Sequence, residues 1–157
     1  MWTIYEGKSM EVQPDFRELL ALFNENEVEY MVIGGYALAF HGAPRFTGDL
    51  DVYVKPDLEN ARRILGALAR FGFKSVDLSL EDFQSPDNVI QLGLPPVRVD
   101  ILTAITGVSW EEAASGRVQG RYGDITVPYI GRDHFIANKR AAGRTRDLAD
   151  LEALDEG

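Results

Sequence analysis

The chain contains 157 residues, of which 45% are hydrophobic and 26% are charged, and its formal net charge is −9. This length is typical of one domain, and the composition excludes a disordered chain, a coiled coil and a collagen-like fibre. Because the sequence has no cysteine and only two histidines, disulfides and thiolate zinc sites are excluded and a multi-histidine metal site is disfavoured.

No apolar run approaches the roughly 20 residues that a helix needs to span a bilayer, so no membrane segment is expected. Residues 1–6 lack the basic-then-apolar order of a signal peptide. We therefore expect a cytoplasmic protein. An acidic protein is also a poor non-specific binder of nucleic acid, because like charges repel the phosphate backbone.

Hydrophobic spacing and turn residues predict five elements in the first half of the chain. In order they are a helix, a buried strand, a short helix, a second strand and a third helix, over residues 14–27, 30–33, 36–41, 49–54 and 58–71. Pro14 suits the first turn of the first helix, and Asp57 is the expected N-cap of the third.

In the second half, residues 77–96 contain three prolines and are expected to be irregular. We then expect a strand, a short helix capped by Ser109, a hairpin of two strands and two terminal helices, over residues 97–102, 110–114, 117–122, 125–129, 134–142 and 146–154. Strands that alternate with helices, followed by a hairpin, indicate an α/β or α+β fold with a mixed sheet flanked by helices.

Two aspartates lie two positions apart on the strand over residues 49–54. Because side chains alternate along a strand, Asp49 and Asp51 share one face with Tyr53, and the other face, of Leu50, Val52 and Val54, is expected to meet the core. Two carboxylates on a largely buried strand raise each other's pKa unless a cation lies between them. Asp100 projects from the non-core face of the strand over residues 97–102, together with Arg98, which could simply neutralise it.

If these two strands are neighbours, three carboxylates converge. Oxygen ligands of this kind suit Mg²⁺ or Mn²⁺ rather than zinc, and two such ions can clamp the attacking and leaving oxygens of a phosphoryl transfer. The alternative is a set of ordinary aspartates at strand ends that face water. This alternative applies more to Asp100 alone than to the pair of Asp49 and Asp51.

The turn Gly34-Gly35 joins a buried strand directly to a helix. Glycines there let the backbone approach a ligand, and a helix N-terminus offers unpaired N–H groups, so the turn predicts a phosphate site. The alternative is that the turn needs glycine for its backbone conformation alone. A group of basic residues near the C-terminus suits a small polyanion, such as a nucleoside triphosphate, or a solvated helix face; it comprises Arg132, Lys139, Arg140, Arg144 and Arg146.

Together these motifs resemble the DNA polymerase β-like nucleotidyltransferase superfamily, whose signature is a glycine turn, an Asp-x-Asp strand and a third carboxylate on a later strand. The closer similarity is to small bacterial nucleotidyltransferase-like proteins related to abortive-infection type toxins. The matching residues are Gly34-Gly35-Tyr36-Ala37, His41-Gly42, Arg45, Thr47, Asp49 and Asp51, then residues 95–103 (PPVRVDILT), then residues 138–150 (NKRAAGRTRDLAD). The resemblance spans roughly residues 28–154.

The resemblance implies one nucleotidyltransferase domain over residues 1–157, in which residues 131–157 form a C-terminal helical pair packed beside the active site. It also implies a metal-dependent transfer of a nucleoside monophosphate from a nucleoside triphosphate to a hydroxyl, with release of pyrophosphate. The acceptor would be an RNA end, a protein or a small molecule. Asp49 and Asp51 would bind Mg²⁺ or Mn²⁺, and Asp100 would complete the metal site and help to deprotonate the acceptor hydroxyl.

The resemblance further implies how the nucleotide is held: Gly34 and Gly35 would cradle phosphate, Lys139 would hold the triphosphate, and Arg45 and Thr47 would line the pocket. Arg146 would reach phosphate or pair with a carboxylate. Alternatively, Lys139 is a surface lysine, and Asp150 is its structural partner or that of Arg140.

Two features depart from the family pattern. Tyr36 follows the glycine pair where the usual turn is Gly-Ser, so a serine contact to phosphate is missing, and the spacing from glycine to aspartate is longer than in the smallest members. A non-catalytic nucleotide-binding or partner-binding component of a toxin–antitoxin pair, with a cognate antitoxin, is therefore the alternative function.

Overall fold

The computed structural model describes residues 2–5, 8–43, 48–73, 77–94 and 96–155, with the backbone alone for residues before 12. Arg45 and Thr47, which the sequence placed in the nucleotide pocket, lie outside the described residues. No helix in the described ranges has both the length and the apolar character needed to cross a membrane.

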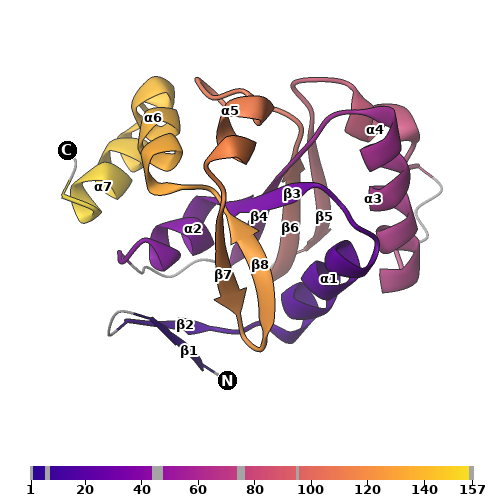
Figure 1. Ribbon diagram of the computed structural model, residues 1–157, viewed down its shortest axis with the longest axis horizontal. Coiled ribbons are helices and arrows are strands. Elements are labelled where there is room, and N and C mark those ends of the chain that lie inside the picture. The colour runs from indigo at the N-terminus through magenta and orange to yellow at the C-terminus, as the bar shows by residue number, and fades with distance from the viewer. Residues whose placement is uncertain (1, 6–7, 44–47, 74–76, 95, 156–157) are drawn as a thin grey trace.

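A six-stranded mixed sheet forms the centre of the molecule (Figure 1). Its strands, in spatial order, are β5 (Val89–Leu94), β6 (Val97–Leu102), β4 (Asp49–Val54), β3 (Tyr30–Ile33), β8 (Ile125–Tyr129) and β7 (Val118–Tyr122). The pairs β4–β6 and β3–β8 are parallel, and the remaining neighbours are antiparallel. A separate two-stranded sheet is formed by β1 (Trp2–Tyr5) and β2 (Lys8–Glu11). The sheet therefore confirms the predicted mixed α/β architecture.

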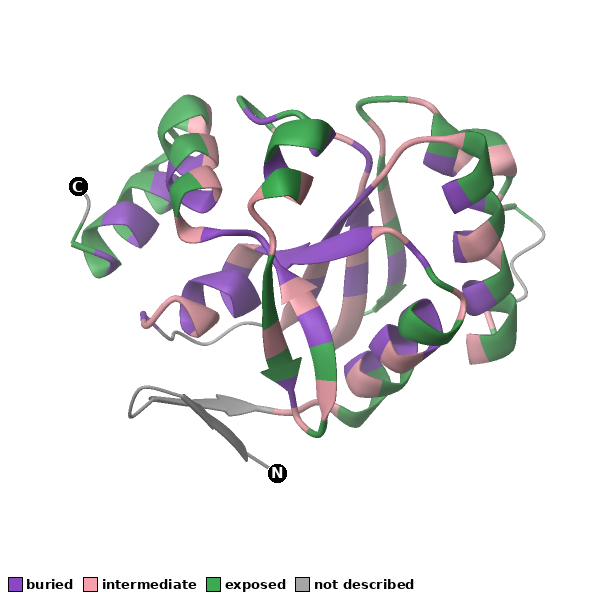
Figure 2. Cartoon of the chain, viewed as in Figure 1, coloured by how far each residue is buried: buried purple, intermediate pink, exposed green. Residues whose placement is uncertain are grey.

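Helices surround the sheet, and two groups of them lie at opposite ends of the molecule (Figure 1). In chain order they are α1 (Pro14–Glu25), α2 (Gly34–Phe40), α3 (Leu58–Phe71), α4 (Leu80–Gln84), α5 (Trp110–Ser115), α6 (Arg132–Ala142) and α7 (Thr145–Ala153). The helices α1, α3 and α4 gather at one end, while α6 and α7 pack against each other at the other. Each helix presents its buried residues to the interior and its polar residues to solvent (Figure 2).

Both faces of the central strands are covered. On β4 the predicted core residues Leu50, Val52 and Val54 are fully buried. Tyr53 lies on the opposite face and is also buried, because its ring packs edge-on against Trp110 with the centroids 5.2 Å apart. The polar character of that face is thus restricted to the first half of the strand, at Asp49 and Asp51.

One sequence prediction about the fold is wrong. Residues 77–96, expected to be irregular, contain helix α4 and edge strand β5, which pairs antiparallel with β6 along its whole length. The prolines do not interrupt these elements, because Pro86 lies before β5 and Pro96 lies after it. The other predicted helices and strands are confirmed, with ends that agree or differ by one or two residues. The predicted caps Asp57 and Ser109 both accept a backbone N–H.

Candidate active site

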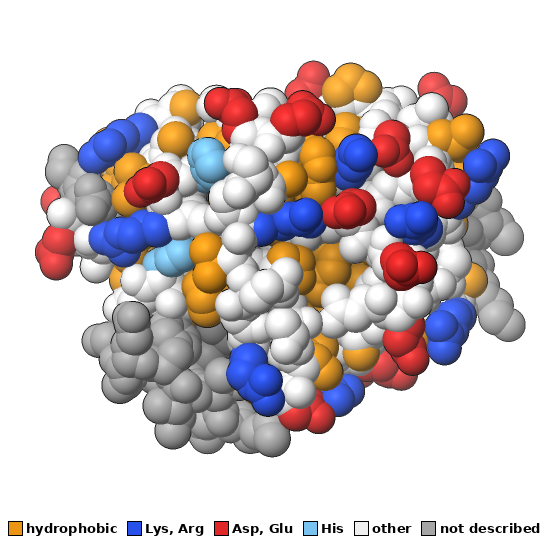
Figure 3. All heavy atoms as spheres, viewed as in Figure 1, with side chains coloured by type: hydrophobic (Ala, Val, Ile, Leu, Met, Phe, Trp, Pro, Cys, Tyr) orange, Lys and Arg blue, Asp and Glu red, His pale blue; other side chains and the backbone are white. Residues whose placement is uncertain are grey.

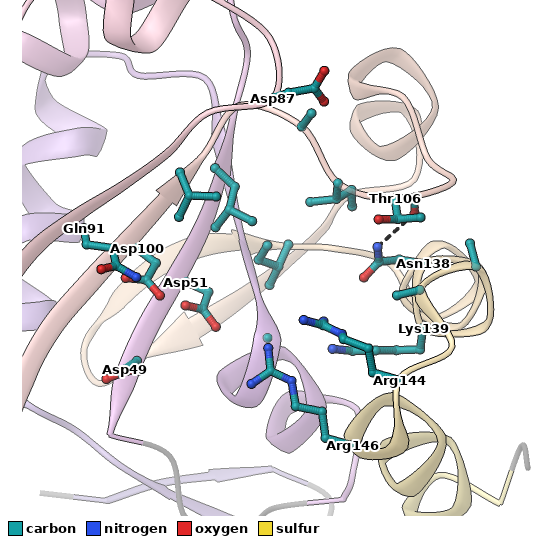
Figure 4. Close-up of a pocket in the computed structure, with 18 of the residues that line it drawn as sticks. Asp49, Asp51, Asp87, Gln91, Asp100, Thr106, Asn138, Lys139, Arg144 and Arg146 are labelled. Carbon is teal, nitrogen blue, oxygen red and sulfur yellow. Dashed lines mark hydrogen bonds between the residues drawn. The ribbon is translucent and has the colours of Figure 1, made fainter.

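The two carboxylate strands are direct neighbours. In the parallel pair β4–β6, Asp51 lies opposite Asp100 and Asp49 lies opposite Arg98. Residues that are opposite each other in adjacent strands point to the same face of the sheet, so the predicted convergence of Asp49, Asp51 and Asp100 follows from this register. Figure 4 shows the three side chains together on one wall of a pocket.

The carboxyl group of Asp51 is the most perturbed member of this set. Its pKa is raised to about 7, first by burial and then by the negative charges of Asp100 and Asp49 and a hydrogen bond with Asp100. The charge of Lys139 acts in the opposite direction. The ionised form of Asp51 is therefore disfavoured in this environment, and a nearby cation would stabilise it.

Arg98 lies against two of the carboxylates. Its Nε donates to Oδ1 of Asp100 at 3.0 Å and its Nη2 donates to Oδ2 at 3.0 Å, a bidentate ion pair. The same Nε lies 3.8 Å from Oδ2 of Asp49. The possibility that Arg98 neutralises Asp100, which its position on the strand suggested, is thus realised in the structure.

The donor set fits a hard divalent cation in its chemistry, because all three side chains offer carboxylate oxygens and repel one another. In the described part of the chain, however, no group of three or more acidic or histidine side chains is arranged to hold a metal ion. Both oxygens of Asp100 are directed to Arg98. The chemistry of the three carboxylates thus suits a divalent cation, while in this structure Arg98 lies against Asp49 and Asp100.

Gly34 borders this group and is the first residue of α2. Its φ is +67°, a left-handed conformation that favours glycine, and a Cβ at this position would collide with Oδ2 of Asp51. Gly35 is buried behind it and does not line the pocket. Position 34 therefore requires glycine for its backbone conformation, as the alternative interpretation of this turn held. The absence of a side chain at Gly34 also leaves the space that the Asp51 carboxylate occupies.

The pocket has a volume of about 670 Å³ and opposite walls of opposite charge. One wall carries Asp49, Asp51 and Asp100 from the sheet, and the other carries Lys139 of α6, Arg144 at the N-cap of α7 and Arg146 of α7 (Figure 4). The size lies in the usual range for small-ligand sites. A ligand that carries both bound cations and phosphates would match the two walls.

Lys139 is a member of a buried ion-pair network. Its Nζ lies 3.3 Å from Oδ1 of Asp147 and 3.6 Å from Oδ2 of Asp150, and its side chain is 11% exposed. The structural partnership between Asp150 and Lys139 is therefore present. Lys139 nevertheless borders the pocket, and its charge lowers the pKa of Asp51.

Asp147 ties the network to the start of α7. It is fully buried and accepts hydrogen bonds from Nε of Arg144 at 2.7 Å and from the Arg144 backbone N–H at 3.1 Å. Burial disfavours its ionised form, but the hydrogen bonds from Arg144 and the charge of Lys139 outweigh burial and hold its pKa below the usual range. The network fixes the turn that carries Arg144 and Arg146.

Arg146 differs from its neighbours, because its guanidinium forms no ion pair with any described residue and extends into the pocket (Figure 4).

The sequence did not identify the pocket residues Asp87, Val89 and Gln91, which lie on or beside strand β5, in a segment that was expected to be irregular. The alternation of Val89, Gln91 and Gly93 with Ile90, Leu92 and Leu94 was the signal that could have identified that strand.

The solved structures that are similar to this one include a candidate nucleotidyltransferase and an adenylyltransferase. A candidate nucleotidyltransferase from Thermotoga maritima matches over 94% of this chain and 97% of its own, with a TM-score of 0.61 and 18% identity. The lincosamide antibiotic adenylyltransferase LnuA, bound to lincomycin, matches over 91% and 96%, with a TM-score of 0.60 and 16% identity. The antibiotic-resistance factor ANT(2″)-Ia matches over 90% and 80%, with a TM-score of 0.55 and 13% identity.

No family model and no curated protein sequence matches the chain. At identities below 20%, the similarity to solved structures concerns the arrangement of the elements rather than the individual residues. The chain has the nucleotidyltransferase fold.

Proposed function

We propose that this protein is a metal-dependent nucleotidyltransferase, which transfers a nucleoside monophosphate from a nucleoside triphosphate to an acceptor hydroxyl and releases pyrophosphate. The observation that carries the proposal is the pocket in which Asp49, Asp51 and Asp100 face a wall of cations. The nucleotidyltransferase fold supports it, and so do the adenylyltransferase and the antibiotic-resistance factor among the similar structures. The protein would act as a soluble enzyme in the cytoplasm.

On the carboxylate wall, Asp49 and Asp51 would hold Mg²⁺ or Mn²⁺, and Asp100 would complete the set when Arg98 releases it. The bound ion would supply positive charge to the phosphate oxygens during transfer. The Asp100 carboxylate would also accept the proton of the acceptor hydroxyl. Gly34 would leave room for Asp51 to reach this position and would bring the backbone close to phosphate, while Gly35, which is buried and does not line the pocket, would support the turn.

On the opposite wall, Arg146 would bind the triphosphate directly, because its charge has no partner in the described part of the chain. Lys139 was proposed from the sequence to hold the triphosphate. Since its Nζ already has two carboxylate partners, we propose that it adds positive potential to the pocket and anchors the turn between α6 and α7. Residues 131–157 would thus form the helical pair that closes the nucleotide side of the site.

The test is to measure binding and turnover separately in the purified chain. Calorimetry with each of the four triphosphates, with and without Mg²⁺, should show metal-dependent binding. Pyrophosphate release should follow when an acceptor is supplied. The double variant Asp49→Asn/Asp51→Asn should lose both, while Glu59→Gln, a surface carboxylate on α3 with 62% of its side chain exposed, should retain both.

Metal-dependent binding without pyrophosphate release from any class of acceptor would instead support the alternative, a non-catalytic component of a toxin–antitoxin pair. Absence of triphosphate binding would contradict the proposal altogether.

A further inference from the structure

Beyond the carboxylate wall and the basic wall, the pocket continues along strand β5, where its lining is apolar and acidic. We call this part the β5 side. It is lined by Asp87, Val89, Gln91, Leu102, Ile105 and Thr106. In Figure 4, Asp87 and Thr106 lie across the pocket from Arg146. None of the described residues on the β5 side is basic, whereas three basic residues lie on the α6–α7 wall.

The register of the sheet aligns the β5 side with the carboxylates. Asp51 of β4 lies opposite Asp100 of β6, which lies opposite Gln91 of β5, so these three residues form one row across the sheet. In the next row, Leu102 lies opposite Val89. The polar row of Asp51, Asp100 and Gln91 therefore lies next to the apolar pair of Leu102 and Val89, on the same face of the sheet.

The apolar pair is open to solvent. Val89 lies on an edge strand with 56% of its surface exposed, and it is one of few large apolar residues in the described chain that are exposed to this degree. Leu102 and Ile105 are half-buried beside it. An exposed apolar surface inside a pocket gains free energy when a ligand covers it, so this pair fits an apolar part of a substrate.

Asp87 places a negative charge at the border of this surface. It has a φ of +63°, which is uncommon for a residue other than glycine. Its turn is held by Asn88, whose backbone N–H donates to Oγ1 of Thr103 at 2.8 Å and whose Nδ2 donates to the carbonyl of Asp82 at 3.0 Å. The carboxylate of Asp87 forms no ion pair with a described residue, so its charge is available to a ligand.

The charge around Asp87 determines what kind of acceptor suits the β5 side. Between Lys74 and Arg98 the sequence has no basic residue, and Asp77, Glu81 and Asp82 are acidic. Acidic side chains also gather along the edge of the molecule that carries α4 and α5 (Figure 3). Such a surface repels the backbone of RNA and attracts a cation.

We infer that the acceptor is a small amphipathic hydroxylated amine. Its ammonium group binds Asp87, its apolar part covers Val89 and Leu102, and its hydroxyl lies between Gln91 and Asp100. This inference rests on the proposed function. In the transfer, the acceptor oxygen forms a bond to the α-phosphorus as the bond from that phosphorus to the β-phosphate oxygen breaks. The hydroxyl proton passes to Asp100, and pyrophosphate leaves with the electron pair of the broken bond.

The experiment compares amines with their neutral counterparts. The probes are a panel of hydroxylated amines in which an apolar ring separates the ammonium from the hydroxyl, with 4-(2-aminoethyl)benzyl alcohol as the simplest, and the N-acetyl derivative of each. Binding is measured by calorimetry in the presence of Mg²⁺ and a non-hydrolysable triphosphate analogue, and pyrophosphate release is measured with the natural triphosphate. An RNA oligonucleotide and a denatured protein are included as acceptors of the other two classes.

We expect the amines to bind more tightly than their N-acetyl derivatives, and Asp87→Asn to weaken the amines by up to about fivefold, the effect of one exposed ion pair. Asp87→Asn should not change the affinity for the triphosphate or for the N-acetyl derivatives. Glu81→Gln, which makes the same change of charge on the exposed face of α4 outside the pocket, should leave all affinities unchanged.

The inference is overturned if no amine binds the wild-type protein more tightly than Asp87→Asn, or if RNA or protein is the better acceptor. Either result leaves the proposed function standing when triphosphate binding and pyrophosphate release are intact. Loss of metal-dependent triphosphate binding in the wild-type protein would overturn the proposed function itself, and with it the inference.

Discussion

Gly34 and Asp51 are in direct contact: a Cβ placed on Gly34 would lie 3.0 Å from Cγ of Asp51 and closer still to its Oδ2. The two residues are brought together because Ile33, the last residue of β3, lies opposite Asp51 in the antiparallel pair β3–β4. The glycine turn and the aspartate strand thus form one structural unit. Any side chain at position 34 would have to displace the carboxylate.

Gly34→Ala should therefore affect both stability and metal binding. The left-handed φ alone is expected to cost about 1–3 kcal/mol of unfolding free energy. The clash should also move the Asp51 carboxylate and weaken Mg²⁺-dependent triphosphate binding. Urea denaturation and calorimetry measure the two effects. Gly66→Ala on α3 is the control, because a Cβ there would meet only Oδ1 of Asn26 at 3.5 Å; it should be neutral or stabilising.

The raised pKa of Asp51 predicts a pH dependence of the metal-free protein. In the unfolded chain this carboxyl has its ordinary pKa of 3.8, while in the folded protein its pKa is about 7. Between these values the folded state binds more protons, so the unfolding free energy should fall as pH rises, by at most about 4 kcal/mol from this group.

Asp51→Asn should remove this dependence and be the more stable protein above pH 7 when no metal is present. The measurement is the unfolding free energy from urea titrations between pH 4 and 8. Mg²⁺ should raise the melting temperature of the wild type more at high pH than at low pH, since a ligand of the folded state stabilises it. A difference between the two proteins that does not vary with pH would contradict the assignment.

Arg98 should compete with metal for Asp100. In Arg98→Gln the bidentate ion pair is lost, so Mg²⁺ or Mn²⁺ should bind more tightly, by up to about fivefold for removal of one partly exposed ion pair. The metal-free variant should be less stable, because Asp100 then faces Asp51 and Asp49 without a counter-charge. Arg70→Gln, which removes a surface ion pair to Glu25, should change neither property. Weaker metal binding in Arg98→Gln would show that Arg98 positions Asp100 rather than competing for it.

Asp147 should be the residue of the C-terminal helices on which stability depends most. Asp147→Ala removes the partner shared by Lys139 and Arg144 and leaves the buried Lys139 with Asp150 as its remaining partner in this network. Breaking a buried ion pair from one side typically costs about 3–5 kcal/mol. Asp133→Ala, on the exposed side of α6, should cost much less. The comparison is made by urea denaturation, and equal losses in the two variants would contradict the structural role of the network.

Arg146 should bind phosphate without contributing to stability. A charge-assisted contact is worth about 1.5–3 kcal/mol, so Arg146→Ala should weaken all four triphosphates by roughly tenfold or more while nucleoside affinity is unchanged. The loss should shrink at high salt. Arg140→Ala, an exposed arginine on α6 outside the pocket, should have no such effect. If Lys139→Ala weakens triphosphates while Arg146→Ala does not, the role proposed from the sequence for Lys139 is restored.

Local patterns in the sequence were sufficient for most of the elements and for the principal carboxylates. Alternation along residues 49–54 places Asp49 and Asp51 on one face whatever the neighbouring strands are, and the caps at Asp57 and Ser109 are set by residues within one helical turn. The sequence did not predict strand β5, because the alternation of its side chains is short and lies among prolines. The strand is recognised in the structure by its antiparallel pairing with β6. Edge strands depend on such pairing, which no local pattern contains.

The relationships that define the site depend on register and on packing between distant segments. The sequence could place Asp51 and Asp100 together only on the condition that their strands are neighbours, and only the parallel pairing β4–β6 satisfies it. Gly34 contacts Asp51 because β3 runs antiparallel to β4. Lys139 is buried because α7 packs against α6 and places Asp147 and Asp150 beside its ammonium group. The sequence determined which residues carry the charges; the tertiary structure decided which charges neutralise one another and which remain for a ligand, because electrostatic energies depend on distance and burial rather than on order along the chain.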